Sequence, residues 1–231
     1  METVDGARIS TLAVSDLLGR PLNDVERKFA PPALYISGPM QVPFPRPRVS
    51  IVGSRKASPD GLAAASAIAS TLVKRGVVIV SGLAEGIDAS AHEAAIAAGG
   101  RTIAVLGTPL NKVYPQKNLQ LQQKIARNHL VISQFPTGHA TRPKDFVLRN
   151  RTMALISDAT IIVEAGETSG SLHQGWDALR LGRSLFIWKS ILSNRELRWP
   201  EKMMRYGAME LSDPEDVLEV LPSALQMPLF Q

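Results

Sequence analysis

Residues 49–82 read VSIVGSRKASPDGLAAASAIASTLVKRGVVIVSG, and this stretch indicates the fold class. A run of β-branched residues opens it, another closes it, and an alanine-rich segment lies between them. Ser58 followed by Pro59 is typical of a helix start, and Gly76 is typical of a helix end. A strand, a helix and a second apolar strand form the repeating unit of parallel sheets.

The same alternation of apolar strands and helical segments continues along the chain. We expect strands at 49–52, 77–80, 102–106, 130–133, 160–163 and 185–188. Helices are expected at 58–75, 88–98, 119–128, 150–157 and 171–181. Buried strands that alternate with helices predict an α/β fold with a doubly wound, mostly parallel sheet, because right-handed crossovers place helices on both faces.

The sequence divides into a core domain and two short flanking segments. Residues 1–45 hold a weak helical pattern followed by prolines, which predicts a short N-terminal helical appendage. This segment is too short to be an independent domain. Residues 46–222 carry the strand and helix alternation and form the core domain, and residues 223–231 are a C-terminal tail.

Composition excludes several classes of protein. Hydrophobic residues make up 45% and charged residues 20%, as in globular rather than disordered chains. No apolar run approaches the roughly 20 residues of a membrane span, and the N-terminus lacks the pattern of a secretory signal, so we expect a cytoplasmic protein without membrane contact. The chain has no cysteine and only four histidines, so neither a disulfide, a metal site nor a bound cofactor is expected.

Charge is distributed unevenly along the chain. Residues 101–151 contain nine Lys or Arg and one acidic residue, whereas residues 207–231 contain five acidic residues and no Lys or Arg. A basic segment of this kind suits a polyanionic partner. The alternative is that the cations only solvate helix surfaces.

Glycine and a hydroxyl residue recur in the loops that follow the strands. The loops at 53–56, 81–86, 107–108 and 164–171 all lie at the carboxyl ends of predicted strands, where α/β sheets bind ligands. Backbone N–H groups and hydroxyls cradle phosphate, and Arg55 adds a bidentate partner. The chain lacks both G-x-G-x-x-G and G-x-x-x-x-G-K-[ST], which argues against NAD and ATP.

Basic and aromatic residues are interleaved near residue 146. Phe146 lies among Lys144, Arg149 and Arg151, and Asn150 is interpreted as the cap of the helix that follows. This pattern suits a groove that follows a nucleic-acid backbone and stacks a base on the ring. The alternative is a core position for Phe146.

No set of residues indicates catalysis. No serine lies in a G-x-S-x-G elbow. Asp88 and His92 lie four residues apart, and we interpret them as a helix cap and a packing residue. Glu164 either acts as a general base or only holds a loop. These residues alone do not assemble a catalytic site.

Six segments in this order resemble the DNA-processing protein A (DprA/Smf) family. They are residues 51–55, 80–92, 100–108, 113–115, 146–151 and 169–172. Where the family reads S-G-S-L-I-T-A, this chain has Leu172-His173-Gln174-Gly175-Trp176 after Ser171. It also lacks the V-P-G that the family has after the last strong strand. It is also identified as a member without the C-terminal winged-helix domain.

The resemblance implies an extended Rossmann fold and a DNA-binding function without catalysis. Such proteins bind and protect single-stranded DNA, assist loading of a RecA-type recombinase in natural transformation and recombination, and form homodimers. By motif match, the DNA or phosphate site would comprise Gly53, Ser54, Arg55, Ser81, Gly82, Lys144, Phe146, Arg149, Asn150, Arg151, Ser169, Gly170 and Ser171.

Two further interpretations stay open. The same pocket could serve a nucleotide-binding sensor or a nucleotide hydrolase of a related Rossmann family, although residues 164–170 differ from the P-G-G-x-G-T-x-x-E of such hydrolases. In the tail, Gln226, Leu229 and Phe230 resemble the Q-x-x-L-F peptide that binds the replication sliding clamp. The alternative for the tail is docking onto the domain itself.

Overall fold

The computed structural model describes residues 3–4 and 7–222 of the chain. Within these residues one sheet has nine strands, in the order β11-β10-β9-β5-β6-β7-β8-β4-β3. They are β3 (Ser10–Leu12), β4 (Leu34–Ser37), β5 (Arg48–Gly53), β6 (Val78–Ser81), β7 (Thr102–Leu106), β8 (Leu130–Ser133), β9 (Ala159–Glu164), β10 (Ser184–Trp188) and β11 (Met209–Leu211). Neighbours from β11 to β8 pair in parallel, which confirms the predicted mostly parallel α/β sheet.

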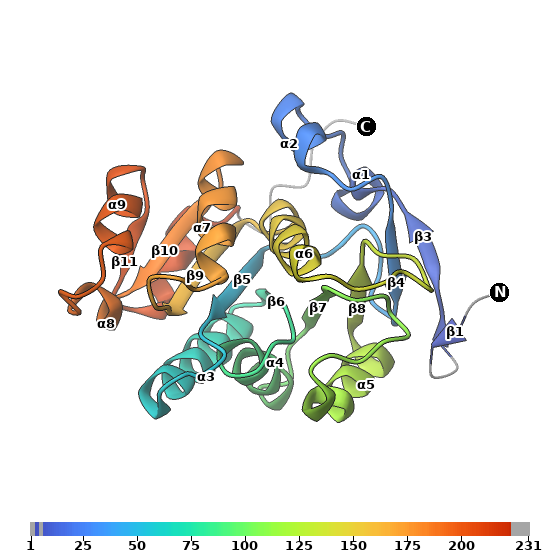
Figure 1. The fold of residues 1–231 in the computed structure, drawn as a ribbon, viewed down its shortest axis with the longest axis horizontal. Coiled ribbons are helices and arrows are strands. Elements are labelled where there is room, and N and C mark those ends of the chain that lie inside the picture. Colours follow the sequence, from blue (N-terminus) through green and yellow to red (C-terminus); the bar gives the residue numbers. More distant parts are fainter. Residues whose placement is uncertain (1–2, 5–6, 223–231) are drawn as a thin grey trace.

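Helices cover both faces of this sheet (Figure 1). One layer holds α3 (Pro59–Lys74), α4 (Ile87–Ala97) and α5 (Leu119–Asn128), and the other holds α6 (Pro143–Ile156) and α7 (Ser171–Arg180). The shorter elements are β1 (Thr3–Val4), β2 (Ala7–Arg8), α1 (Val14–Leu18), α2 (Asp24–Phe29), η1 (Gln116–Asn118), α8 (Lys189–Leu192), α9 (Trp199–Arg205) and η2 (Pro214–Val220). None of the helices that the structure describes is long and apolar enough to span a bilayer.

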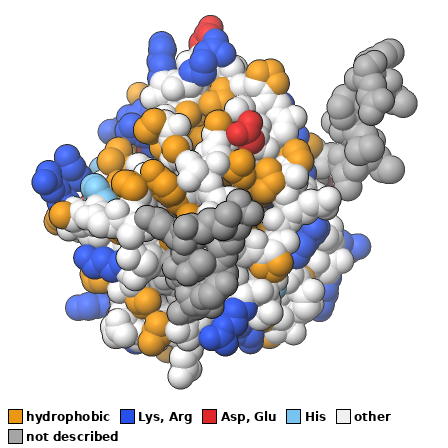
Figure 2. Space-filling model, turned by 90° about the vertical axis from the view of Figure 1, so that its right-hand side faces the viewer, with side chains coloured by type: hydrophobic (Ala, Val, Ile, Leu, Met, Phe, Trp, Pro, Cys, Tyr) orange, Lys and Arg blue, Asp and Glu red, His pale blue; other side chains and the backbone are white. Residues whose placement is uncertain are grey.

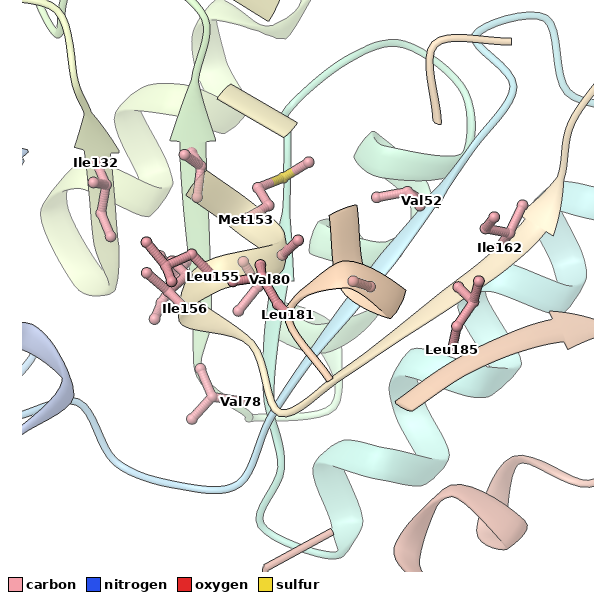
Figure 3. Close-up of a cluster of buried hydrophobic side chains, with 14 of the residues drawn as sticks. Val52, Val78, Val80, Ile132, Met153, Leu155, Ile156, Ile162, Leu181 and Leu185 are labelled. Carbon is pink, nitrogen blue, oxygen red and sulfur yellow. The ribbon is translucent and has the colours of Figure 1, made fainter. Parts of the chain in front are cut away.

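Successive residues of the central strands pack into different helical layers. Val49 and Ile51 of β5 belong to the cluster that includes α3 and α4, whereas Val52 belongs to the cluster that includes α6. Figure 3 shows this second cluster, in which Met153 and Leu155 of α6 lie over the strands. Burial on both faces explains why these strands appear in the sequence as continuous apolar runs.

The first 45 residues contribute to the sheet, which the sequence did not indicate. The strand β4 pairs antiparallel with β8, and β3 pairs antiparallel with β4. We expected only a helical appendage because both strands are short and lie near prolines, which weaken a strand pattern. On this side of the molecule, hydrophobic side chains gather between lysines and arginines (Figure 2).

A buried carboxylate joins this N-terminal segment to the core domain. Glu26 of α2 is fully buried and lies 2.6 Å from Arg20 and 2.5 Å from Arg183, which follows α7. The hydrogen bond from Arg20 is the largest of the effects that lower the pKa of Glu26, from 4.5 to about 2. Because the folded pKa is depressed, the carboxylate stabilises the fold above pH 4.5, and this contribution is lost as the pH falls toward 2.

We expect Glu26→Gln to lower the free energy of unfolding at pH 7 by about 3 kcal/mol, because the variant leaves a partly buried Arg183 without its counter-charge. Urea unfolding at pH 7 and at pH 3 measures the effect, and the difference between wild type and variant should shrink at the lower pH. Glu201→Gln is the control, since Glu201 pairs with Arg205 on the exposed side of α9. Equal destabilisation by both substitutions would contradict this role of Glu26.

Candidate functional site

An open cleft of about 430 Å³ lies at the carboxyl ends of β5 and β9. Its walls are the loop after β5, the loop that leads into α7, and one face of α6. Ligands of doubly wound sheets bind at this edge, because the loops and helix N-termini there point backbone N–H groups outward. The cleft is therefore the candidate functional site.

The loop after β5 is held by backbone contacts that require glycine. The backbone N–H of Ser54 donates to the carbonyl of Glu164 at 2.7 Å, and that of Ile87 donates to the carbonyl of Ser54 at 3.2 Å. A Cβ on Gly53 would lie 2.6 Å from Cγ1 of Ile87 and 2.7 Å from the carbonyl oxygen of Glu164. Gly86 has a φ of +75°, and a Cβ there would lie 2.3 Å from the carbonyl oxygen of Ser54. This packing presents Ser54 and Arg55 to the cleft.

Glu164 fixes the position of the loop rather than facing a substrate. Its carboxylate accepts hydrogen bonds from the backbone N–H of Ser58 at 3.1 Å and from the Ser58 hydroxyl at 2.5 Å. Ser58 caps α3 as predicted, since its Oγ accepts the backbone N–H of Gly61 at 3.0 Å. Of the two interpretations of Glu164, these contacts support the loop-holding one.

The N-terminus of α7 forms the opposite rim of the cleft. Ser169 and Ser171 place their hydroxyl oxygens 2.7 Å apart, and Asn150 of α6 donates to the carbonyl of Gly170 at 3.0 Å. The partial positive charge at a helix N-terminus favours a bound anion. With Arg55 across the cleft, this rim can hold a phosphate group.

Two neighbouring aromatic rings line a smaller pocket that adjoins the cleft, and one of them, Phe146, also lines the cleft. The half-buried ring of Phe146 is 5.1 Å from the ring of Tyr114, and the guanidinium of Arg55 is 5.6 Å from the Phe146 ring centroid. Gly107 leaves room for Phe146, because a Cβ there would lie 2.5 Å from the ring. Tyr114 was not among the predicted site residues, although it is nearly half exposed. The only signal for it was its place in the Val-Tyr-Pro segment at 113–115.

A buried cation lies beneath the cleft. Arg149 donates to the carbonyls of Gly82 and Val105, the latter at 2.8 Å, and its Nε donates to Asn150 at 2.9 Å. Burial lowers the pKa of Arg149 to about 10, so the side chain stays charged at neutral pH. Its hydrogen bonds to carbonyls make it a support of the cleft floor, and its charge still attracts an anion above it.

Asp88 and His92 of α4 complete this support. The Asp88 carboxylate accepts the backbone N–H groups of Gly82 at 3.1 Å and Ala84 at 3.4 Å, and burial raises its pKa. His92 lies 2.7 Å from the hydroxyl of Thr102, and burial lowers its pKa to about 3. These contacts support the interpretation of His92 as a packing residue. Asp88 instead holds the loop before α4 and does not cap that helix, whose cap position is Gly86.

The cleft brings together most of the predicted site residues. Those that line it are Gly53, Ser54, Arg55, Phe146, Arg149, Asn150, Ser169, Gly170 and Ser171. Gly82 lines a smaller adjoining pocket beside Phe146.

Three predicted residues lie elsewhere. The buried hydroxyl of Ser81 donates to the Ile51 carbonyl at 2.7 Å, within the sheet. Arg151 stacks 4.9 Å from the Phe29 ring centroid, on another face of α6, and Lys144 is exposed in the first turn of that helix. The sequence predicts a helix only from residue 150, with Asn150 as its cap. In the structure α6 begins at Pro143, so helical periodicity separates these residues and Asn150 lies inside the helix.

The first turn of α6 explains why the helix begins at Pro143, before the start predicted at residue 150. Pro143 occupies the first helical position, and Asp145 accepts the backbone N–H of Arg142 at 2.7 Å. Asp145 also accepts from His139 at 2.8 Å. Proline at the first position with an acid in the first turn is a helix start, and the basic residues around it obscured that pattern.

The comparisons with known proteins agree with this geometry. The family model for DNA recombination-mediator protein A matches residues 20–222. The DNA processing protein DprA of Bacillus subtilis is 35% identical over 195 residues, which cover 84% of this chain and 66% of that protein. The chain spans between 40% and 66% of the length of three such curated relatives.

Two solved structures share the fold over 92% of this chain. DNA processing protein A from Streptococcus pneumoniae has a TM-score of 0.77 at 33% identity, with 74% of that chain covered. DNA processing protein A from Helicobacter pylori, described for its single-stranded DNA binding mode, has a TM-score of 0.77 at 26% identity, with 94% of that chain covered.

We expect Gly53→Ala to lower the free energy of unfolding by about 1–3 kcal/mol, because the added Cβ displaces the loop between Ile87 and Glu164. Gly166→Ala is the matched control, since Gly166 lies in the same cleft but a Cβ there would have nothing within 4 Å. Chemical denaturation of both variants measures the difference. A Gly53→Ala protein as stable as Gly166→Ala would show that the loop tolerates displacement.

Proposed function

The chain belongs to the DNA recombination-mediator protein A family, and from this premise we propose that it binds single-stranded DNA in the cleft and performs no catalysis there. The observation that carries the proposal is the placement of an aromatic ring beside Arg55 in a cleft that the N-terminus of α7 also lines. Phe146 and Arg55 are adjacent, and Arg55 faces the N-terminus of α7 across the cleft. Stacking of bases combined with cationic backbone contacts is how proteins hold single strands without sequence preference.

The contacts of Glu164 argue for binding over hydrolysis. A nucleotide hydrolase needs a general base or nucleophile that faces its substrate. The carboxylate of Glu164 is instead engaged by Ser58 at the start of α3. Asp88 lines the cleft, but its carboxylate is engaged by the backbone N–H groups of Gly82 and Ala84. A nucleotide-binding sensor is the competing function, and competition by a mononucleotide against an oligonucleotide separates the two.

We further propose that the bound strand is protected and passed to a RecA-type recombinase in the cytoplasm, during transformation or recombination. The names of the relatives, which are DNA processing proteins, support this role.

We also propose a homodimer. Its support is the face of α7 and α9, where the rings of Trp176 and Tyr206 lie 5.4 Å apart and Tyr206 is 67% exposed.

Arg55→Ala should weaken single-stranded DNA binding by about 1.5–3 kcal/mol, because a charge-assisted contact to phosphate is lost. The slope of log affinity against log salt should fall by about 0.7 for each phosphate contact removed. Fluorescence anisotropy with a labelled oligonucleotide measures both quantities. Arg75→Ala is the control, since Arg75 follows α3 and pairs with Glu215 away from the cleft. Wild-type affinity in the Arg55→Ala protein would remove the phosphate assignment.

Phe146→Leu should reduce strand affinity by about 1–3 kcal/mol while changing the melting temperature little, because leucine keeps apolar contact beside Gly107 but offers no ring for stacking. The same anisotropy assay and a thermal melt measure the two effects. If the melting temperature falls and affinity is retained, the ring serves packing only.

The tail residues Gln226, Leu229 and Phe230 lie outside the described residues, and we propose that they bind the replication sliding clamp. Two large apolar side chains next to each other suit a partner's apolar pocket, and the glutamine adds hydrogen bonds at its edge. The test is a pull-down of the clamp by the wild-type chain and by Leu229→Ala, Phe230→Ala. We expect the wild-type chain alone to recover the clamp, and equal recovery of the clamp by both chains would contradict the proposal.

A further inference from the structure

Gln174 of α7 is a fully buried amide that lines the cleft. Neither its Nε2 nor its Oε1 has a hydrogen-bond partner among the residues that the structure describes. Buried polar groups in native proteins are nearly always paired, because an unpaired one loses its hydration without compensation. An unpaired donor and acceptor at the wall of a ligand cleft therefore point to a ligand that supplies both partners.

The lining of the cleft combines polar and apolar surface. Ser54, Arg55 and the N-terminus of α7 form a polar rim that suits an anion. Val52, Val147 and Met153 contribute apolar surface to the same cleft. Binding sites for small aromatic groups have this composition, with mostly apolar walls and a few placed polar groups. A nucleotide has the matching form, with a charged phosphate at one end and a flat base at the other.

The amide of Gln174 identifies which part of a nucleotide it contacts. Phosphate oxygens are acceptors, so a phosphate would pair Nε2 and leave Oε1 unpaired. The hydrogen-bonding edge of every nucleobase places a donor next to an acceptor. A glutamine amide turned by 180° exchanges its own donor and acceptor, so one side chain can match each of these edges.

We propose that Gln174 anchors the edge of one nucleobase that turns into the cleft behind Phe146. The assignment rests on the proposed function, since the base belongs to the bound single strand. Proteins that take a base out of the stack hold it in this way, by hydrogen bonds to its edge and by packing against apolar or aromatic side chains. Gln174 is thus a specificity residue for a base-bearing strand over a bare phosphate backbone.

The test compares two oligomers of equal length and charge, one of thymidylate and one of abasic tetrahydrofuran residues, by fluorescence anisotropy with the full chain. Gln174→Met should bind the thymidylate oligomer roughly tenfold more weakly than wild type and the abasic oligomer less than twofold more weakly. Its melting temperature should not fall, because the substitution removes an unpaired buried amide. Gln122→Met is the control, since Gln122 of α5 also has a buried unpaired Oε1 but does not line the cleft.

A second measurement uses the wild-type chain alone, so it does not depend on how the variant folds. A thymidylate oligomer methylated at N3 keeps its charge and ring but loses the donor of the base edge, and we expect it to bind roughly tenfold more weakly. Equal affinity for methylated and unmethylated oligomers, or an equal loss for Gln174→Met on both the thymidylate and abasic oligomers, would overturn the base anchor alone. Failure of the wild type to bind any oligomer would overturn the proposed function as well.

Discussion

The guanidinium of Arg149 is the contact on which the cleft depends. It projects from α6 on one face of the sheet and donates to carbonyls at the ends of β6 and β7. From α4 on the other face, the Asp88 carboxylate accepts the backbone N–H of Gly82. Because Arg149 and Asp88 are buried beside one another, each offsets part of the other's loss of hydration. The hydrogen bonds of these two side chains to Gly82 thus tie both helical layers to the loop after β6.

This arrangement also explains why glycine is required at position 82. A Cβ on Gly82 would lie 2.1 Å from Nη1 of Arg149, so any larger residue would displace the guanidinium. The displaced cation would lose its carbonyl partners while remaining buried, which is costly. The glycine-containing loops therefore have two purposes. Gly53 and Gly86 permit close backbone packing, whereas Gly82 gives space to a charged side chain.

The sequence was sufficient to predict the buried part of the fold. Six strands appear as apolar runs because they are covered on both faces, and the serine and proline at 58–59 correctly indicated the start of α3. β3 and β11 were missed because each has three residues, too few for a periodic signal. For the site, the sequence predicted which residues would take part but not which of them would face the cleft. Helical periodicity in α6 then decided that Phe146 and Asn150 line the cleft while Arg151 packs on Phe29.

The charge pattern overstated how many cations line the cleft. Within the basic segment 101–151, Arg149 is buried under carbonyls, Arg151 stacks on Phe29, and Lys117 pairs with Glu85. The cations that line the cleft with exposed side chains, Arg55 and Lys56, come from outside that segment. A few phosphate contacts alone bind weakly at physiological salt. A cleft lined by so few exposed cations must therefore gain affinity from its ring and apolar walls, and the unpaired amide of Gln174 in its lining is consistent with a site that holds a base as well as a phosphate.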